Sequence, residues 1–209
     1  MPGAAASNQL VVFVKAPRPG LVKTRLAAVI GPAAAAEAYK TLAESLFSRL
    51  ASTVDIELKY TPADAEAEIL QWLRPGWSRS PQCAGGLGDR LSDAFADAFA
   101  RGAKRVVIIG SDCPYLDCGD LDQAFDLLSG NDVVLGPAGD GGYWLIGLQK
   151  PQPSLFQSIP WSTETVLAAT LAAADRRGLR VGRLRKLDDV DTVEDYRRFT
   201  LWRGQDAPF

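Results

Sequence analysis

Three aspartates follow segments that the sequence predicts to be buried strands. Residues 106–112 read VVIIGSD, and in LDDVDTVEDY Asp189 and Asp191 follow a second predicted strand. Ligands of open α/β sheets bind beyond the carboxyl ends of the strands, where these side chains would lie. Close carboxylates repel one another by roughly 4 kcal/mol per pair at an effective dielectric constant of about 20, and a divalent cation removes that repulsion. The pattern therefore predicts Mg²⁺, or Mn²⁺, on Asp112, Asp189 and Asp191.

Each of these acids also has a purely structural interpretation, which the sequence leaves open. Asp112 fits a simple turn after a strand, and residues 188–195 fit a solvated, acidic helix start. The chain contains no His, which excludes Ser-His-Asp and Cys-His catalysis, imidazole bases and His-ligated zinc. The available chemistry is that of carboxylates, Lys, Arg, backbone amides and a hard metal ion.

A cation-rich loop, FVKAPRPGLVKTRL, follows the first predicted strand. Arg binds phosphate oxygens in a bidentate manner and Lys supplies a compact charge, so the loop predicts a polyphosphate site. Lys23 and Arg25 are the candidate catalytic groups that would stabilise charge growing on a leaving phosphate. The loop meets neither the P-loop nor the G-x-G-x-x-G spacing, and the charges of an ordinary soluble loop are the alternative interpretation. The candidate phosphate contacts here are Lys15, Arg18, Gly20, Lys23 and Arg25.

Two glycine-rich loops add further candidate contacts. In CAGGLGDRL the amides of Gly85, Gly86 and Gly88 precede an amphipathic helix and, with Ser111, are candidates for nucleotide or phosphate binding. In PAGDGGYWLIGL, Asp140 is a candidate catalytic base or ligand-orienting group, although Asp-Gly and Gly-Gly also make plain hairpin turns. The candidate contacts to an acceptor substrate are Gly141, Gly142, Tyr143, Trp161 and Thr163.

The bulk composition limits the classes of partner. The chain has 209 residues and a formal net charge of −2, so no global basic field favours nucleic acid or an anionic membrane. Its apolar runs are too short to span a bilayer, and three cysteines do not make a disulfide framework. We expect a cytoplasmic protein without membrane insertion, and the sequence leaves the oligomeric state open.

The elements that must position these residues alternate between Val- and Ile-rich runs and segments of helical period, a pattern typical of parallel βαβ units. We predict one layered α/β domain over residues 1–209, with its core at about 10–202. Asp120 and Thr192 are predicted helix N-caps. Strands are predicted at Leu10–Lys15, Val54–Tyr60, Ser78–Gln82, Arg105–Ile109, Asp132–Gly136, Tyr143–Leu148 and Val181–Leu187. Helices are predicted at Pro32–Ala51, Ala63–Leu73, Leu87–Arg101, Leu121–Leu128, Thr163–Arg177 and Val193–Trp202.

Six ordered motifs resemble one bacterial family: KAPRPGLVKTRL, GGLGDRL, VVIIGSDCPYL, GPAGDGGYWLIGL, IPWSTETV and DDVDTVEDY. The family comprises radical-SAM/selenodomain-associated transferases of glycosyltransferase-A fold, long catalogued as a domain of unknown function within the nucleotide-diphospho-sugar transferase superfamily. The resemblance spans about residues 10–199. It implies a single-domain three-layer sandwich, in which helices cover both faces of a mixed, mostly parallel sheet. It also implies a nucleotide in the amino-terminal half and a metal on Asp112.

The cationic loop is also similar to that of the 2-phospholactate and phosphoenolpyruvate guanylyltransferases. Lys15, Lys23 and Arg25 match their Lys and K-[ST]-R-L, and the D-V-D-T acids of those relatives would assign Asp189 and Asp191 to the metal. Two patterns of related enzymes are missing. The L-x-G-G-x-S-x-R-M-G loop of molybdenum-cofactor guanylyltransferases does not occur, and G-S-D-C-P replaces the D-x-D of many glycosyltransferases.

Three functional hypotheses follow. The first is a metal-dependent glycosyltransferase that moves a sugar from a nucleotide-diphospho-sugar to a small-molecule acceptor. The second is a guanylyltransferase-like nucleotidyltransferase that uses a nucleoside triphosphate and releases pyrophosphate. The third is a nucleotide-binding module without catalytic activity. In both enzymatic versions the catalysis is largely positioning and electrostatic stabilisation.

Overall fold

A seven-stranded mixed sheet forms the centre of the protein in a computed structural model that describes residues 8–50 and 55–205. The strand order is β3-β2-β1-β4-β6-β5-β7, and only β6 runs antiparallel to its neighbours. The predicted mixed, mostly parallel α/β sheet is therefore confirmed. The strands are β1 Asn8–Lys15, β2 Asp55–Thr61, β3 Ser78–Pro81, β4 Arg105–Gly110, β5 Val133–Pro137, β6 Tyr143–Leu148 and β7 Val181–Arg183.

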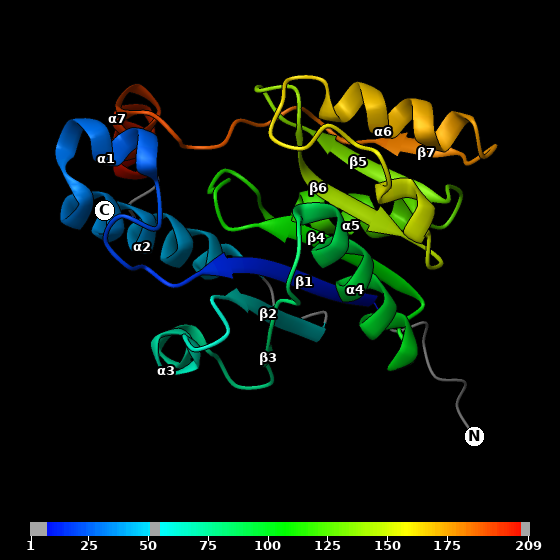
Figure 1. The fold of residues 1–209 in the computed structure, drawn as a ribbon, viewed down its shortest axis with the longest axis horizontal. Coiled ribbons are helices and arrows are strands. Elements are labelled where there is room, and N and C mark those ends of the chain that lie inside the picture. The colour runs from blue at the N-terminus through cyan, green and yellow to red at the C-terminus, as the bar shows by residue number, and fades with distance from the viewer. Residues whose placement is uncertain (1–7, 51–54, 206–209) are drawn as a thin grey trace.

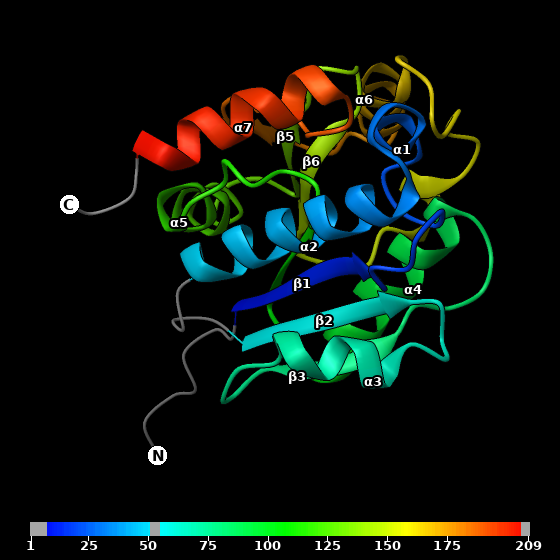
Figure 2. The same cartoon turned by 90° about the vertical axis from the view of Figure 1, so that its left-hand side faces the viewer.

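Helices cover both faces of the sheet (Figures 1 and 2). Helices α2 and α5 pack on one face, and α4 and α6 pack on the other. The last helix, α7, packs against α2 through Phe199 and Leu42. The α-helices are α1 Thr24–Ile30, α2 Pro32–Arg49, α3 Glu66–Ile69, α4 Leu87–Ala100, α5 Cys118–Leu127, α6 Val166–Asp175 and α7 Val193–Gln205, and the short 3₁₀ helices are η1 Leu70–Trp72 and η2 Pro153–Phe156.

The central strands are buried on both faces, which explains their nearly continuous apolar sequences. In β1 the side chains of Leu10, Val12 and Val14 enter the cluster under α2 and α5, whereas Val11 enters the cluster under α4 and α6. Because its side chains alternate between the two faces of the sheet, β1 contributes to both clusters. In the part of the chain that the structure describes, no helix is both long and apolar enough to cross a membrane.

Several predicted boundaries differ from the observed ones. The strand predicted over 181–187 ends at Arg183, although the Leu184 and Leu187 amides still donate to the Leu135 and Pro137 carbonyls. The helix predicted over 63–73 is a single α-turn followed by a 3₁₀ turn, and the helix predicted from 163 begins at Val166. The predicted ends at 51 and 54 lie outside the described residues.

The two predicted N-caps have different outcomes. Thr192 caps α7, since its hydroxyl accepts from the Asp195 amide at 3.2 Å. The N-cap of α5 is Asp117 and not Asp120, so this helix begins three residues earlier than predicted. The Asp120 carboxylate instead accepts from the Asp117 amide and closes a reciprocal capping box.

Candidate active site

A continuous cleft lies beyond the carboxyl ends of β1 and β4 and consists of three adjoining cavities. The apolar cavity, of about 270 Å³, includes Phe13, Leu91, Ile109, Tyr143 and Leu145 in its lining, with Lys15, Gln82, Arg90, Ser111 and Asp112 as polar members. The charged cavity, of about 350 Å³, is lined by Lys15, Val22, Lys23, Thr24, Arg25, Tyr39, Asp112, Ser162 and Asp191. The outer cavity, of about 570 Å³, includes Arg25, Asp140, Tyr143, Trp161, Thr163, Asp189 and Asp191.

The three cavities adjoin one another, since neighbouring cavities share lining residues. Lys15 and Asp112 line both the apolar and the charged cavity. Arg25 and Asp191 line both the charged and the outer cavity. The cleft therefore offers an apolar compartment, a charged middle and a wider polar end in sequence.

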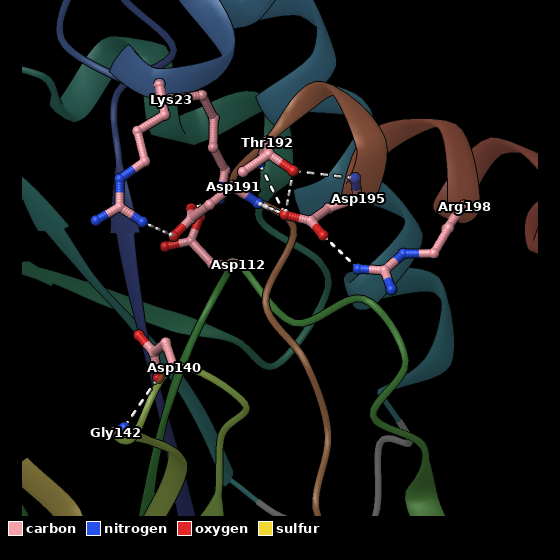
Figure 3. A network of polar contacts seen from close by, with 9 residues as sticks. Lys23, Asp112, Asp140, Gly142, Asp191, Thr192, Asp195 and Arg198 are labelled. Atoms are coloured by element: carbon pink, nitrogen blue, oxygen red, sulfur yellow. Dashed lines mark hydrogen bonds and ion pairs between the residues drawn. The ribbon is translucent and has the colours of Figure 1, made fainter. Parts of the chain in front are cut away.

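Asp112 and Asp191 meet in this cleft although 79 positions separate them in the sequence. A backbone hydrogen bond from the Val190 amide to the Asp112 carbonyl, at 3.0 Å, joins the segment after β4 to the segment before α7. Both carboxylates then face the Lys23 ammonium, which forms an ion pair with Asp112 and lies 3.1 Å from Asp191 Oδ1 (Figure 3). The structure thus brings together the first predicted acid, one of the later acids and the predicted loop lysine.

Lys23 is held in this position by its backbone and by burial. It precedes α1 in a left-handed conformation, with φ 48° and ψ 49°, which non-glycine residues seldom adopt. Its side chain is only 3% exposed. Burial disfavours the charged ammonium, but Asp112 and Asp191 outweigh that effect and raise the pKa of Lys23. Lys23 is therefore a buried cation that depends on two carboxylates.

The third predicted metal ligand, Asp189, lines the outer cavity beside Asp191. Burial, with Asp112 as the second cause, raises the pKa of Asp189 to about 7. Among the described residues, however, no group of three or more Asp, Glu, His or Cys side chains is arranged to hold a metal ion. Asp112 and Asp191 converge on the Lys23 ammonium, and the metal site on Asp112, Asp189 and Asp191 stays a prediction.

The other loop cations take different positions. Arg25 is mostly exposed, with Nη1 3.9 Å from Asp191 Oδ2, and Lys15 is exposed at the wall shared by two cavities. Arg18 instead forms ion pairs with Glu68 at 2.6 Å and Asp64 at 3.2 Å, on the side of α3. Gly20 has φ 81° in the turn that the Leu21 amide closes onto the Arg18 carbonyl. Arg18 and Gly20 shape the loop and line none of the three cavities.

Tyr39 of α2 is a site residue that none of the sequence motifs indicated. Its hydroxyl accepts from the Lys15 amide at 2.8 Å and lies 2.7 Å from Ser111 Oγ. It joins the ends of β1 and β4 directly beneath the charged cavity. Burial raises its pKa, so the hydroxyl remains protonated. The predicted ligand contact Ser111 is itself buried and bonded to Tyr39.

The glycines at the start of α4 serve capping and close packing. The Gly86 amide donates to Asp89 Oδ2 at 2.9 Å, so the helix supplies its own anion at this position. A β-carbon on Gly88 would lie 2.8 Å from both the Phe156 carbonyl oxygen and Trp161 Nε1. Gly85, Gly86 and Gly88 do not line the cavities, whereas Leu87 and Arg90 of the same segment do. Leu87 and Arg90 were not among the predicted ligand contacts, although the GGLGDRL motif contains both.

The predicted acceptor residues gather around the outer cavity. Asp140, Gly142, Tyr143, Trp161 and Thr163 all line it. Asp140 Oδ1 accepts a hydrogen bond from the Gly142 amide at 2.9 Å. Figure 3 shows this pair away from the contacts of Lys23 with Asp112 and Asp191. Tyr143 and Trp161 meet edge to face with their ring centroids 6.5 Å apart.

Gly141 has a structural role next to this cavity. Its φ is 86°, and a β-carbon there would lie 2.0 Å from the Glu164 carbonyl oxygen. Its own carbonyl accepts from the Leu167 amide at 2.9 Å. Only glycine permits this close approach, which fixes the start of α6 against the β5–β6 loop.

More than half of the chain matches a known protein family. Residues 47–163, which include β4, Asp112 and the Asp140 loop, match the family DUF2064, described as an uncharacterised protein conserved in bacteria. The chain belongs to this family. Among proteins with curated descriptions, none matches it.

Solved structures extend the comparison to the whole fold. A protein from Desulfovibrio desulfuricans G20, provisionally named a nucleotide-diphospho-sugar transferase, is 36% identical, with a TM-score of 0.87 over 97% of this chain and 89% of that one. A CMP:2-keto-3-deoxy-manno-octonic acid synthetase, solved in complex with CTP, has a TM-score of 0.62 at 10% identity, covering 96% of this chain and 100% of that one. A cytidylyltransferase from Leptospira borgpetersenii serovar Hardjo-bovis has a TM-score of 0.62 at 15% identity, covering 98% and 89%. At these low identities, the last two show a shared fold only.

Proposed function

We propose that this DUF2064 protein is a metal-dependent transferase that uses an activated nucleotide, with glycosyl transfer from a nucleotide-diphospho-sugar as the first candidate reaction. The observation that carries the proposal is the convergence of Asp112, Asp191, Lys23 and Arg25 in the middle of a cleft at the strand ends. The D. desulfuricans protein, at 36% identity, supports the class of donor. The association with radical-SAM/selenodomain proteins remains a prediction from the motifs.

Each compartment of the cleft suits one part of such a donor. The apolar cavity, with ring and aliphatic walls and a few polar groups such as Gln82 and Arg90, suits a nucleoside. The charged cavity suits the phosphates, because Lys15, Lys23 and Arg25 line it. The outer cavity, which Asp140 and Trp161 line, suits the transferred sugar and the acceptor.

The two central carboxylates fit a hard divalent cation. Asp112 and Asp191 already converge on a cationic group, and both are partly exposed, at 39% and 41%. Mg²⁺ is usually held by one or two carboxylates together with waters and substrate phosphates, so a cage of three acids is not required. When bound, Mg²⁺ or Mn²⁺ would neutralise phosphate charge and act as a Lewis acid.

The chain's own groups would supply the remaining stabilisation. Lys23 and Arg25 would offset the negative charge that develops on the leaving phosphate, in a partly buried site where such charges act strongly. Asp140 would orient the acceptor, since its second carboxylate oxygen is available beyond the bond to Gly142. Asp189 would contribute a proton-exchanging group at the border of the outer cavity.

One observation favours nucleotidyl transfer as a second candidate. Three cations, Lys15, Lys23 and Arg25, face a single cavity, and a triphosphate carries more negative charge than a diphosphate linked to a sugar. In that version the attack falls on the α-phosphate and pyrophosphate leaves. A low-identity resemblance of fold to a cytidylyltransferase is compatible with either reaction.

Product analysis separates these candidates. The purified protein is incubated with Mg²⁺, a panel of small-molecule acceptors that carry hydroxyl or phosphate groups, and either nucleoside triphosphates or nucleotide-diphospho-sugars. The release of nucleoside diphosphate or pyrophosphate and the nucleotide-dependent thermal stabilisation are measured. Asp112→Asn should abolish the Mg²⁺-dependent stabilisation and turnover. Asp122→Asn, an exposed acid on α5 outside the cleft, is the matched control and should retain both. Stabilisation by no nucleotide, or an equal response of both variants, would contradict the proposal.

A further inference from the structure

The Lys23 ammonium occupies the position between the two carboxylates that a metal ion would need. It forms an ion pair with Asp112, lies 3.1 Å from Asp191 Oδ1, and is almost completely buried. The left-handed backbone at Lys23 directs this one side chain inward, while Arg25, two residues later, is 75% exposed. Lys23 therefore pairs with these acids from a buried position, unlike the cations of exposed ion pairs on a protein surface.

An ammonium and a divalent cation compete for these oxygens. Both need Asp112 and Asp191 as partners, and two positive centres at contact distance in a poorly solvated site repel each other. A metal on these carboxylates would also leave Lys23 as a buried cation without its two counter-charges, which is strongly unfavourable. A metal ion alone therefore has to displace a well-satisfied cation that has no other acid in the charged cavity, whose lining contains no further Asp or Glu.

A bound polyphosphate changes this balance. The charged cavity places Lys23 beside Lys15 and Arg25, so phosphates bound there would give the ammonium a new anionic partner. Asp112 and Asp191 would then be available to a divalent cation. The same three cations repel one another once the acids are engaged elsewhere, which makes the phosphates necessary.

We infer that Lys23 couples metal binding to nucleotide binding: its ammonium holds Asp112 and Asp191 in the free protein, and a divalent cation reaches these carboxylates only when nucleotide phosphates take over the ammonium. This inference rests on the proposed nucleotide-using function. It adds a dependence between the two binding steps, because the cation binds these carboxylates only when the nucleotide is bound. Lys23 acts here as a positioning residue for the two carboxylates.

The direct test measures binding of Mn²⁺ alone, by electron paramagnetic resonance, to the full chain without nucleotide. Lys23→Met, which keeps the length of the side chain but removes its charge, should bind Mn²⁺ at least ten-fold more tightly than the wild type. Lys15→Met removes a cation from the same cavity that has no ion pair with either acid, and should bind like the wild type. Adding Asp112→Asn to Lys23→Met should remove the gain. Equal Mn²⁺ affinity of the wild type and Lys23→Met would overturn the inference.

A thermal melt accompanies each variant, and Lys23→Gln repeats the comparison with a neutral side chain that still donates hydrogen bonds to the acids. In the wild type, a saturating nucleoside triphosphate or nucleotide-diphospho-sugar should raise protein-bound Mn²⁺ at least ten-fold over the metal alone. In Lys23→Met the same nucleotide should add much less, and an undiminished effect would contradict the coupling. If no nucleotide binds the wild type, the proposed function is wrong. The Mn²⁺ affinity of Lys23→Met without nucleotide still tests separately whether Lys23 blocks the metal.

Discussion

At the scale of single residues, the chemistry of the cleft depends on which charges are buried and how they are paired. Lys23 is buried against Asp112 and Asp191, and Arg25 contributes a long, exposed contact of 3.9 Å to the second acid. Asp189 has no cation as a direct partner among the ion pairs of the described residues. Its pKa is raised to about 7 by burial first and by the charge of Asp112 second. Asp189 is thus the cleft acid whose charge changes near neutral pH.

This shift predicts a pH-dependent stability for the metal-free protein. An aspartate in the unfolded chain ionises near pH 4, whereas folded Asp189 keeps its proton up to about pH 7. The folded state therefore binds more protons between these values, and its stability falls as pH rises through that window, by up to about 1.4 kcal/mol per pH unit. Urea unfolding in EDTA at pH 5, 6, 7 and 8 measures the slope. Asp189→Asn should flatten this contribution, and an unchanged slope in that variant would assign it to other groups.

At the scale of elements, the sequence predicted the strands well because their signal is local. Runs such as VVII in β4 are buried on both faces and need no partner to be recognised. The residue at which a helix begins depends more on contacts with distant parts of the chain. Asp117 and Asp120 are equally good caps by type, and Asp120 is held instead by Arg185, which lies 65 positions away at 2.6 Å and also contacts Asp117 at 3.5 Å. Such long-range pairs are not visible in a sequence pattern.

The candidate site was predictable to the same degree. That Asp112, Asp191 and Lys23 belong to one place followed from their positions after predicted strands. Tyr39 carried only a helical spacing signal, which is typical of a core residue, although its hydroxyl bridges two strand ends. Arg18 has the sequence environment of a phosphate ligand but is neutralised by two acids near α3. In both cases the partner comes from a distant element, so only the fold decides the role.

The close packing of α4 against the segment before α6 leads to a prediction at this scale. Gly88→Ala would place a methyl group 2.8 Å from the Phe156 carbonyl oxygen and from the Trp161 indole nitrogen. Overpacking of this kind typically destabilises by about 1–3 kcal/mol, and here it would also displace a ring that lines the outer cavity.

The matched control is Gly86→Ala, two residues earlier, where the nearest atom to the new methyl would be 3.7 Å away. It should cost less than Gly88→Ala in urea unfolding, with only the loss of a favoured N-cap residue. The difference in tryptophan fluorescence between each variant and the wild type would report the displacement of Trp161, because the other four tryptophans are present in all three proteins. Equal losses in the free energy of unfolding of the two variants would mean that Trp161 moves aside at little cost, and would contradict the prediction.

At the scale of the whole molecule, both layers of helices depend on the same strands. The cluster under α2 and α5 and the cluster under α4 and α6 each take side chains from β1 and β4. The cleft lies where these strands end, and the backbone bond from Val190 to Asp112 connects the carboxyl-terminal segment to it. The predicted single domain over residues 1–209 is therefore expected to unfold as one unit, even though chains of this length often populate intermediates.

Two neighbouring residues of β1 test this expectation. Val11 and Val12 are both fully buried, but Val11 enters the cluster under α4 and α6 and Val12 enters the cluster under α2 and α5. Val11→Ala and Val12→Ala should each destabilise by about 1–3 kcal/mol. Because one strand serves both clusters, each variant should shift the urea midpoints of tryptophan fluorescence and far-ultraviolet circular dichroism together. A variant in which the two probes separate would show that one helical layer can unfold while the other persists, and the single-unit prediction would then be wrong.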